Sequence, residues 1–130
     1  MTIEEHIKYW LESAEYDLES SIVNYEAGRY TWCLFIGHLA LEKVLKGLYV
    51  QNNSNSVPPK IHNLIKLANL SSIEITPGQA KLFASINKFQ IEARYIEHKN
   101  ELYKIADKNF TYDYLQKIKE QYIWLKSKIK

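Results

Sequence analysis

Hydrophobic side chains recur at steps of three and four residues through the first 27 positions, which is the spacing of one face of an α-helix. This apolar face consists of Ile3, Ile7, Trp10, Leu11, Ala14, Leu18, Ile22 and Tyr25. Thr2, with Glu5 three positions later, predicts a capping box at the start of the helix, and Gly28 predicts its end. The segment is therefore expected to form an amphipathic helix with one buried face.

Residues 30–51 predict a second helix of a different kind, apolar on nearly every side. Such a helix belongs in the centre of a helical bundle. A stripe of mostly small side chains would let a neighbouring helix approach closely, and it consists of Cys33, Gly37, Ala40, Val44 and Gly47.

The few polar residues of this second helix are His38, Glu42, Lys43 and Lys46. Glu42 and Lys46 have the i,i+4 spacing of a stabilising ion pair. The pattern favours a solvated face, because Lys is rarely buried. The alternative is a buried or cleft-lining network that fixes the bundle and presents Lys43 and Lys46 to a phosphate. His62, which follows a proline loop, is expected to stabilise that loop rather than to perform chemistry.

The middle of the chain also has helical periodicity. A loop at residues 52–59, rich in Asn, Ser and Pro, leads to a short helix over residues 61–69. After a second loop, a helix is predicted over residues 79–95. Residues 96–110 have no clear period, and we interpret them as a loop with a helical turn at residues 101–107.

The last helix is predicted to start with Thr111 as its N-cap. Its inner face would consist of Tyr114, Leu115, Ile118, Tyr122 and Leu125. The chain has only four Gly and three Pro in 130 residues, which favours helices throughout. We therefore predict an all-α fold in which residues 1–130 form a single domain.

Composition narrows the setting of this domain. The single Cys33 excludes an internal disulfide and a Cys-based zinc site, and it favours a reducing compartment. Glu4 and Glu5 stand where a secretory signal would carry basic residues, and no apolar run is long enough to span a membrane. The sequence thus predicts a cytoplasmic protein without a membrane partner.

Charge is unevenly distributed although the formal net charge is only +2. The first 27 residues contain seven acidic groups against one Lys, a net charge of −6, so the remaining 103 residues carry +8. We therefore expect an anionic ligand to bind away from the exposed face of the first helix.

Most catalytic and cofactor motifs are missing from the sequence. The residues His6, His38, His62 and His98 lie on separate elements without metal-ligand spacing, and each of the four Gly stands alone, so no phosphate-binding loop is present. Cys33 lies in the most apolar helix and is expected to be core. No metal and no cofactor is therefore expected.

One pair of residues has the right chemistry for a metal-free ribonuclease. If the helix continues past Tyr95, Arg94 and His98 lie one turn apart on the same face. Arg can clamp a phosphodiester and offset developing charge, while His can move the proton of a 2′-hydroxyl. The alternative is structural, with both side chains capping carbonyls or pairing with Glu97 or Glu101.

Aromatic residues make up 13% of the chain. Those near the first two helices fall at helical spacings and are expected in the core or at an interface: Tyr9, Trp10, Tyr16, Tyr25, Tyr30 and Trp32. Tyr95 and Tyr103 flank the Arg-His segment and are better candidates for contact with a nucleotide. Lys99, Lys104 and Lys108 add positive charge to the same region.

Several short motifs, taken in order and spacing, resemble the HEPN domain over essentially the whole chain. The motifs are Tyr9-Trp10-Leu11, Ala14-Glu15-Tyr16-Asp17-Leu18, Gly28-Arg29-Tyr30, Cys33-Leu34-Phe35, Ala40-Leu41-Glu42-Lys43-Val44-Leu45-Lys46-Gly47, His62-Asn63-Leu64 and Arg94-Tyr95. The resemblance implies an up-down bundle of four main helices with an additional short helix. It also implies a homodimer that forms through the helices near Arg94.

The resemblance further implies a role with RNA or nucleotides. Many HEPN domains are metal-independent RNases or toxins encoded beside a minimal nucleotidyltransferase antitoxin, and others only bind nucleotides or partners. Active members carry an Arg followed, after four to six residues, by a His. Arg94 matches that Arg, and His98 is the nearest His, with three residues between them.

Two interpretations therefore stay open. The first is a toxin-type endoribonuclease in which Arg94 and His98 of two copies form one site. In it, Tyr95, Lys99, Tyr103, Lys43 and Lys46 would contact RNA or a nucleotide. The second is a non-catalytic nucleotide-binding or protein-interaction module with the same fold.

Overall fold

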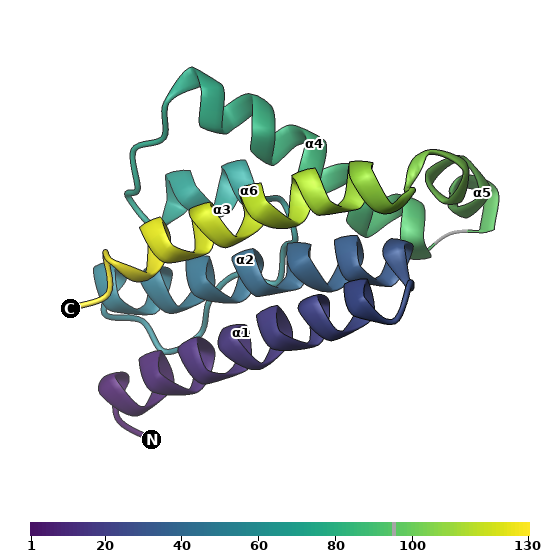
Figure 1. Cartoon of the computed structure of the whole chain (residues 1–130). Helices are drawn as coiled ribbons and strands as arrows, with labels where there is room; N and C mark the ends of the chain where they lie inside the picture. Colours follow the sequence, from purple (N-terminus) through teal and green to yellow (C-terminus); the bar gives the residue numbers. More distant parts are fainter. Residues whose placement is uncertain (95) are drawn as a thin grey trace.

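A computed structural model describes residues 1–94 and 96–130, with side chains described outside 92–100. In this part of the chain the structure is all-helical, as predicted, and contains no strand. Its helices are α1 (Ile3–Glu26), α2 (Tyr30–Asn53), α3 (Leu64–Leu70), α4 (Pro77–Arg94), α5 (Ile96–Ile105) and α6 (Lys108–Lys126). Figure 1 shows α1, α2 and α6 side by side along their lengths, with α5 at the same end of the bundle as the turn between α1 and α2.

The α1–α2 hairpin begins and turns where the sequence predicts. Thr2 caps α1 through a capping box, since the Glu5 amide donates to Thr2 Oγ1 and the Thr2 amide to Glu5 Oε1, each at 3.1 Å. Gly28 has a φ of 75°, the left-handed conformation that other residues adopt only at a cost. These two local signals set the length of α1, and α2 follows directly after Arg29.

Helix α2 is the centre of the bundle, also as predicted, and it contacts each of the other helices. Its glycines explain how closely its neighbours approach. A Cβ on Gly37 would lie 2.8 Å from Ile118 Cδ1 of α6, and one on Gly47 would lie 3.3 Å from Trp10 Cβ of α1. The stripe of small residues therefore lets α1 and α6 pack tightly against α2.

The short helix and the last helix differ from the prediction at their starts. Helix α3 begins at Leu64 rather than at residue 61, because Asn63 Oδ1 accepts the amides of Ile65 and Lys66. Helix α6 begins three residues before Thr111, because Asp107 is its N-cap and its carboxylate accepts the Phe110 amide at 2.8 Å. The prediction of a Thr111 cap was wrong, since Thr111 lies buried inside the helix.

The loop predicted for residues 96–110 was also wrong, because residues 96–105 form α5. Leu102 and Ala106 bury one side of this segment against the bundle, whereas Tyr103 and Ile105 are exposed. Two apolar anchors one turn apart give too short a pattern to reveal a helix in the sequence.

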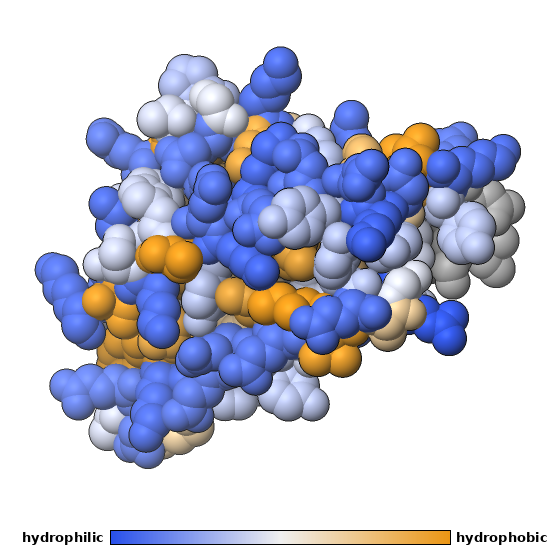
Figure 2. Space-filling model, in the orientation of Figure 1, coloured by the Kyte–Doolittle hydropathy of each residue, from blue (hydrophilic) through white to orange (hydrophobic). Residues whose placement is uncertain are grey.

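The surface is mainly polar, with apolar areas between the charged side chains on the face drawn in Figure 2. Three aromatic residues expected in the core or at an interface, Tyr9, Tyr16 and Trp32, are exposed in this chain and so do not belong to its core. An interface role for them stays a prediction. Within the described helices, none is long and apolar enough to cross a membrane.

Candidate functional site

The two positions of the predicted catalytic pair lie on either side of residue 95, which is outside the described residues. Arg94 is the last residue of α4, and residue 98 belongs to α5. The side chains of Arg94, His98 and Lys99, and Tyr95 as a whole, lie outside the described residues. Tyr103 is described, and the residue is 73% exposed on α5.

Tyr103 lines a cleft that the sequence did not reveal. The cleft has a volume of about 450 Å³ and is bounded by Gly28, Arg29, Tyr30, Thr31 and Trp32 on one side and by Tyr103 and Ala106 on the other. We call it the turn cleft, because it lies between the α1–α2 turn and α5. Arg29 is exposed at its edge. Only long-range packing brings these two segments together, so their sequence carries no local signal of the cleft.

A second polar region reaches from the buried side of α2 to the loop before α3. We call His38, Glu42, Lys46 and His62 the Glu42 cluster, in which the first three residues are buried and His62 is exposed. Glu42 is 4% and Lys46 8% exposed. Lys46 Nζ lies 3.0 Å from Glu42 Oε2, and His62 Nδ1 lies 2.9 Å from Glu42 Oε1. The predicted ion pair is therefore present, but the solvated face favoured by the sequence pattern was wrong. Both carboxylate oxygens have partners, which offsets the cost of burying the charge.

His38 lies behind this ion pair and is fully buried. Its Nδ1 is 3.8 Å from Glu42 Oε1, too far for a hydrogen bond. The Asn87 side chain and the His62 backbone approach the ring, but among the described residues neither ring nitrogen has a partner at good hydrogen-bond geometry. Burial lowers the pKa of His38 to about 4, and the nearby Glu42 carboxylate only partly opposes that effect. The imidazole is therefore neutral at neutral pH.

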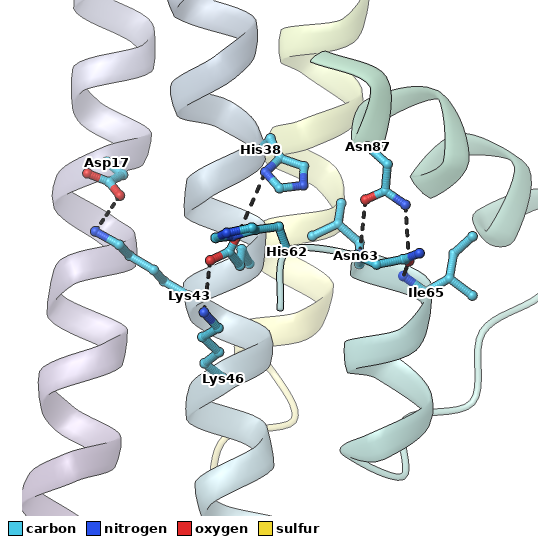
Figure 3. A network of polar contacts seen from close by, with 10 residues as sticks. Asp17, His38, Lys43, Lys46, His62, Asn63, Ile65 and Asn87 are labelled. Atoms are coloured by element: carbon cyan, nitrogen blue, oxygen red, sulfur yellow. Dashed lines mark hydrogen bonds and ion pairs between the residues drawn. The ribbon is translucent and has the colours of Figure 1, made fainter. Parts of the chain in front are cut away.

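Lys43 points away from the Glu42 cluster. Figure 3 shows its side chain reaching Asp17 of α1, where Nζ lies 2.7 Å from Asp17 Oδ2. The same Nζ donates to Ser13 Oγ at 2.8 Å. Lys43 and Lys46 thus have separate carboxylate partners, Asp17 and Glu42, and Lys46 also lies over the Trp10 ring of α1, 5.7 Å from its centroid.

His62 joins the loop before α3 to α2, which agrees with the structural role expected for it. Next to His62, a second contact joins the start of α3 to α4 through Asn63 and Asn87, as Figure 3 shows. Asn87 Oδ1 accepts the Leu64 amide at 3.0 Å, and its Nδ2 donates to Asn63 Oδ1 at 3.2 Å.

The remaining candidates for chemistry have structural surroundings. Cys33 is buried, its carbonyl accepts a 2.7 Å hydrogen bond from Ser21 Oγ, and burial raises the pKa of its thiol. A thiol in such a place is a poor nucleophile. Over the described residues, no group of three or more His, Cys, Asp or Glu side chains is placed to hold a metal ion.

A small helical bundle wound around one central apolar helix is the class of protein that this fold defines. The model of the HEPN domain family matches residues 7–127, and the chain therefore belongs to the HEPN domain family.

Two solved structures share the fold at low sequence identity. TT1696 from Thermus thermophilus is 17% identical with a TM-score of 0.79, over 95% of this chain and 98% of that one. ST0689, described as an archaeal HEPN homologue, is 19% identical with a TM-score of 0.71, over 100% of this chain and 99% of that one. A search of curated proteins finds no match.

Proposed function

We propose that this protein binds RNA or a nucleotide as a homodimer, with Arg94 contacting a phosphate at the end of α4. Membership of the HEPN family over residues 7–127 carries the proposal. We take Arg94, the last residue of α4, as the counterpart of the Arg that active family members carry. The charges of the described residues support it. Exposed Lys104 and Lys108 lie on α5 and at the start of α6, beside exposed Glu101 and Asp107, and seven of the chain's 15 acidic residues lie on α1.

In the catalytic form of the proposal, the protein is a metal-independent endoribonuclease of a toxin-antitoxin pair. Arg94 offsets the charge that develops on the scissile phosphate, and His98 moves the proton of the attacking 2′-hydroxyl or of the leaving group. Two copies supply these residues across a two-fold axis. A minimal nucleotidyltransferase is the proposed partner, and Tyr95 and Lys99 would hold the RNA.

The second candidate is a non-catalytic module of the same fold that binds a nucleotide or a protein. Two observations favour it. Only three residues separate Arg94 from His98, fewer than the four to six expected for active family members. The ion pairs of Lys43 and Lys46 with Asp17 and Glu42 also support a structural role for both lysines.

Incubation of the purified protein with single-stranded RNA in the presence of a chelator separates these candidates. The nuclease form predicts cleavage that is lost in both Arg94→Ala and His98→Ala, and that is kept in the control variants Lys88→Ala of α4 and His6→Ala of α1. Binding without cleavage, with affinity reduced by Arg94→Ala, identifies the binding module. Wild-type protein that neither binds nor cleaves RNA, and binds no mononucleotide, would contradict the proposal.

Sedimentation and co-expression test the assembly. A homodimer predicts twice the chain mass in sedimentation equilibrium at the concentrations used for RNA binding. Co-purification with a nucleotidyltransferase encoded beside this chain would support the partner proposal, and a monomeric protein would contradict the shared site.

A further inference from the structure

From the turn cleft we infer a subsite for one unpaired nucleotide of single-stranded RNA, with Tyr103 stacking on the base and Arg29 pairing with a phosphate. This inference rests on the proposed RNA-binding function. It adds a second contact region, the turn cleft, and a specific form of ligand, one unpaired nucleotide.

The first argument comes from the aromatic surface. The Tyr103 ring is largely exposed on α5, where it offers a face to a ligand. Opposite it, Tyr30 packs on Tyr25 with ring centroids 5.7 Å apart, and Trp32 packs edge-on against Phe35 at 5.8 Å. These contacts hold the opposite wall in place. A base that enters the cleft can therefore stack on the Tyr103 ring and contact Tyr30 and Trp32, which their aromatic neighbours hold in position.

The second argument comes from charge. Arg29 is exposed at the edge of the cleft, and none of the described residues that line it is acidic. The nearest carboxylate in sequence to Ala106, that of Asp107, accepts the Phe110 amide as the cap of α6. The guanidinium can therefore pair with a phosphate while the base occupies the aromatic part of the cleft.

The third argument comes from size. A volume of about 450 Å³ lies within the range of small-molecule sites and suits a single nucleotide better than a helix of RNA. Bases inside an A-form duplex are stacked on both faces and cannot present a ring to Tyr103. The cleft therefore selects an unpaired base, and RNA binding should favour single strands over the duplex of the same sequence.

Fluorescence anisotropy with a labelled single-stranded RNA tests the stacking role. Tyr103→Ala should weaken binding by about tenfold or more, the usual loss for one base–aromatic stack. Tyr103→Phe keeps the ring and should keep wild-type affinity. The matched control is Tyr16→Ala, which removes a Tyr of similar exposure, 70%, from the acidic helix α1 and should leave binding unchanged.

The salt dependence of the same binding tests the role of Arg29. Arg29→Gln should lower the slope of log affinity against log salt concentration by about 0.7, the contribution of one phosphate contact on a single strand. Lys66→Gln, the same charge change on α3, should leave the slope at its wild-type value.

Failure of the subsite can be told apart from failure of RNA binding. If wild-type protein binds RNA and Tyr103→Ala binds equally well, the subsite is wrong and the proposed function stands. If wild-type protein binds no RNA, the RNA-binding form of the proposed function is wrong, and an NMR titration with AMP then tests whether the cleft binds a nucleotide. Amide shifts confined to residues 28–32 and 103–106 would support the subsite, and their absence would overturn it.

Discussion

The Glu42 cluster and the turn cleft both contain polar and charged side chains, but those side chains have opposite surroundings. In the Glu42 cluster, the buried carboxylate has Lys46 at 3.0 Å and His62 at 2.9 Å. In the turn cleft, Arg29 and Tyr103 are exposed to solvent. The charges of the Glu42 cluster pair with one another within the protein, whereas the guanidinium and the aromatic ring of the turn cleft are accessible to a ligand.

This difference separates stability from binding. Charges that satisfy one another inside a bundle cannot also hold a phosphate without breaking their own pairs. Exposed groups lose little when a ligand replaces water around them. We therefore expect substitutions in the Glu42 cluster to change folding, and substitutions in the turn cleft to change RNA binding alone.

The largest effect is expected for Glu42→Gln. This change removes the carboxylate that pairs with Lys46 Nζ and leaves a lysine that is 8% exposed without its ion-pair partner. Loss of one partner of a buried pair typically costs about 3–5 kcal/mol of the free energy of unfolding. Urea denaturation followed by circular dichroism measures the change.

The control for Glu42→Gln is an ion pair with the same i,i+4 spacing on the surface of α6. Lys117 Nζ lies 3.0 Å from Asp113 Oδ2, and both side chains are exposed. Asp113→Asn should hardly change the free energy of unfolding, because exposed pairs contribute little. Equal effects of the two substitutions would show that burial does not govern the Glu42 pair.

The next effect is a pH dependence that His38 confers on the same cluster. Its pKa is about 4 in the folded chain and 6.5 in the unfolded chain, so only the unfolded chain binds this proton between those values. The free energy of unfolding should therefore fall by about 3 kcal/mol as the pH falls from 6.5 to 4. Above pH 6.5 the contribution of His38 is constant.

Other groups titrate in the same range, so the test compares two proteins. The difference in the free energy of unfolding between wild type and His38→Leu should shrink or change sign in favour of the variant as the pH falls from 6.5 to 4. A difference that stays constant over that range would rule out His38 as the source of the acid sensitivity.

The predictable parts of the fold have local signals. Thr2 with Glu5, and Gly28 after α1, set a helix start and a turn through contacts within a few residues. The position of α2 at the centre follows from apolar side chains on nearly every side of the helix. These features depend on the chain's own period and caps, so the sequence is sufficient to predict them.

Errors arose where residues distant in sequence decide the outcome. Thr111 and Asp107 are both good N-cap residues, and the packing of Thr111 into the core left Asp107 as the cap. Glu42 and Lys46 are buried by the packing of the bundle, and His62 reaches Glu42 from a loop 20 residues further along the chain. The turn cleft arises in the same way, from α5 lying beside the α1–α2 turn, and no spacing along the chain could reveal it.

The smallest effect on stability, and the sharpest test of the comparison, is expected for Tyr103→Ala. The residue is 73% exposed, so truncation removes little buried area and should change the free energy of unfolding by no more than about 0.5 kcal/mol. Leu102, the neighbouring residue in α5, is fully buried, and Leu102→Ala should cost about 2–5 kcal/mol in the same urea experiment. If Tyr103→Ala destabilised the protein as much as Leu102→Ala, the ring would be part of the packing of α5, and a loss of RNA binding in that variant could not be assigned to stacking. If Tyr103→Ala were stable but bound RNA weakly, Tyr103 would serve ligand binding at the surface, whereas Glu42 serves the stability of the bundle.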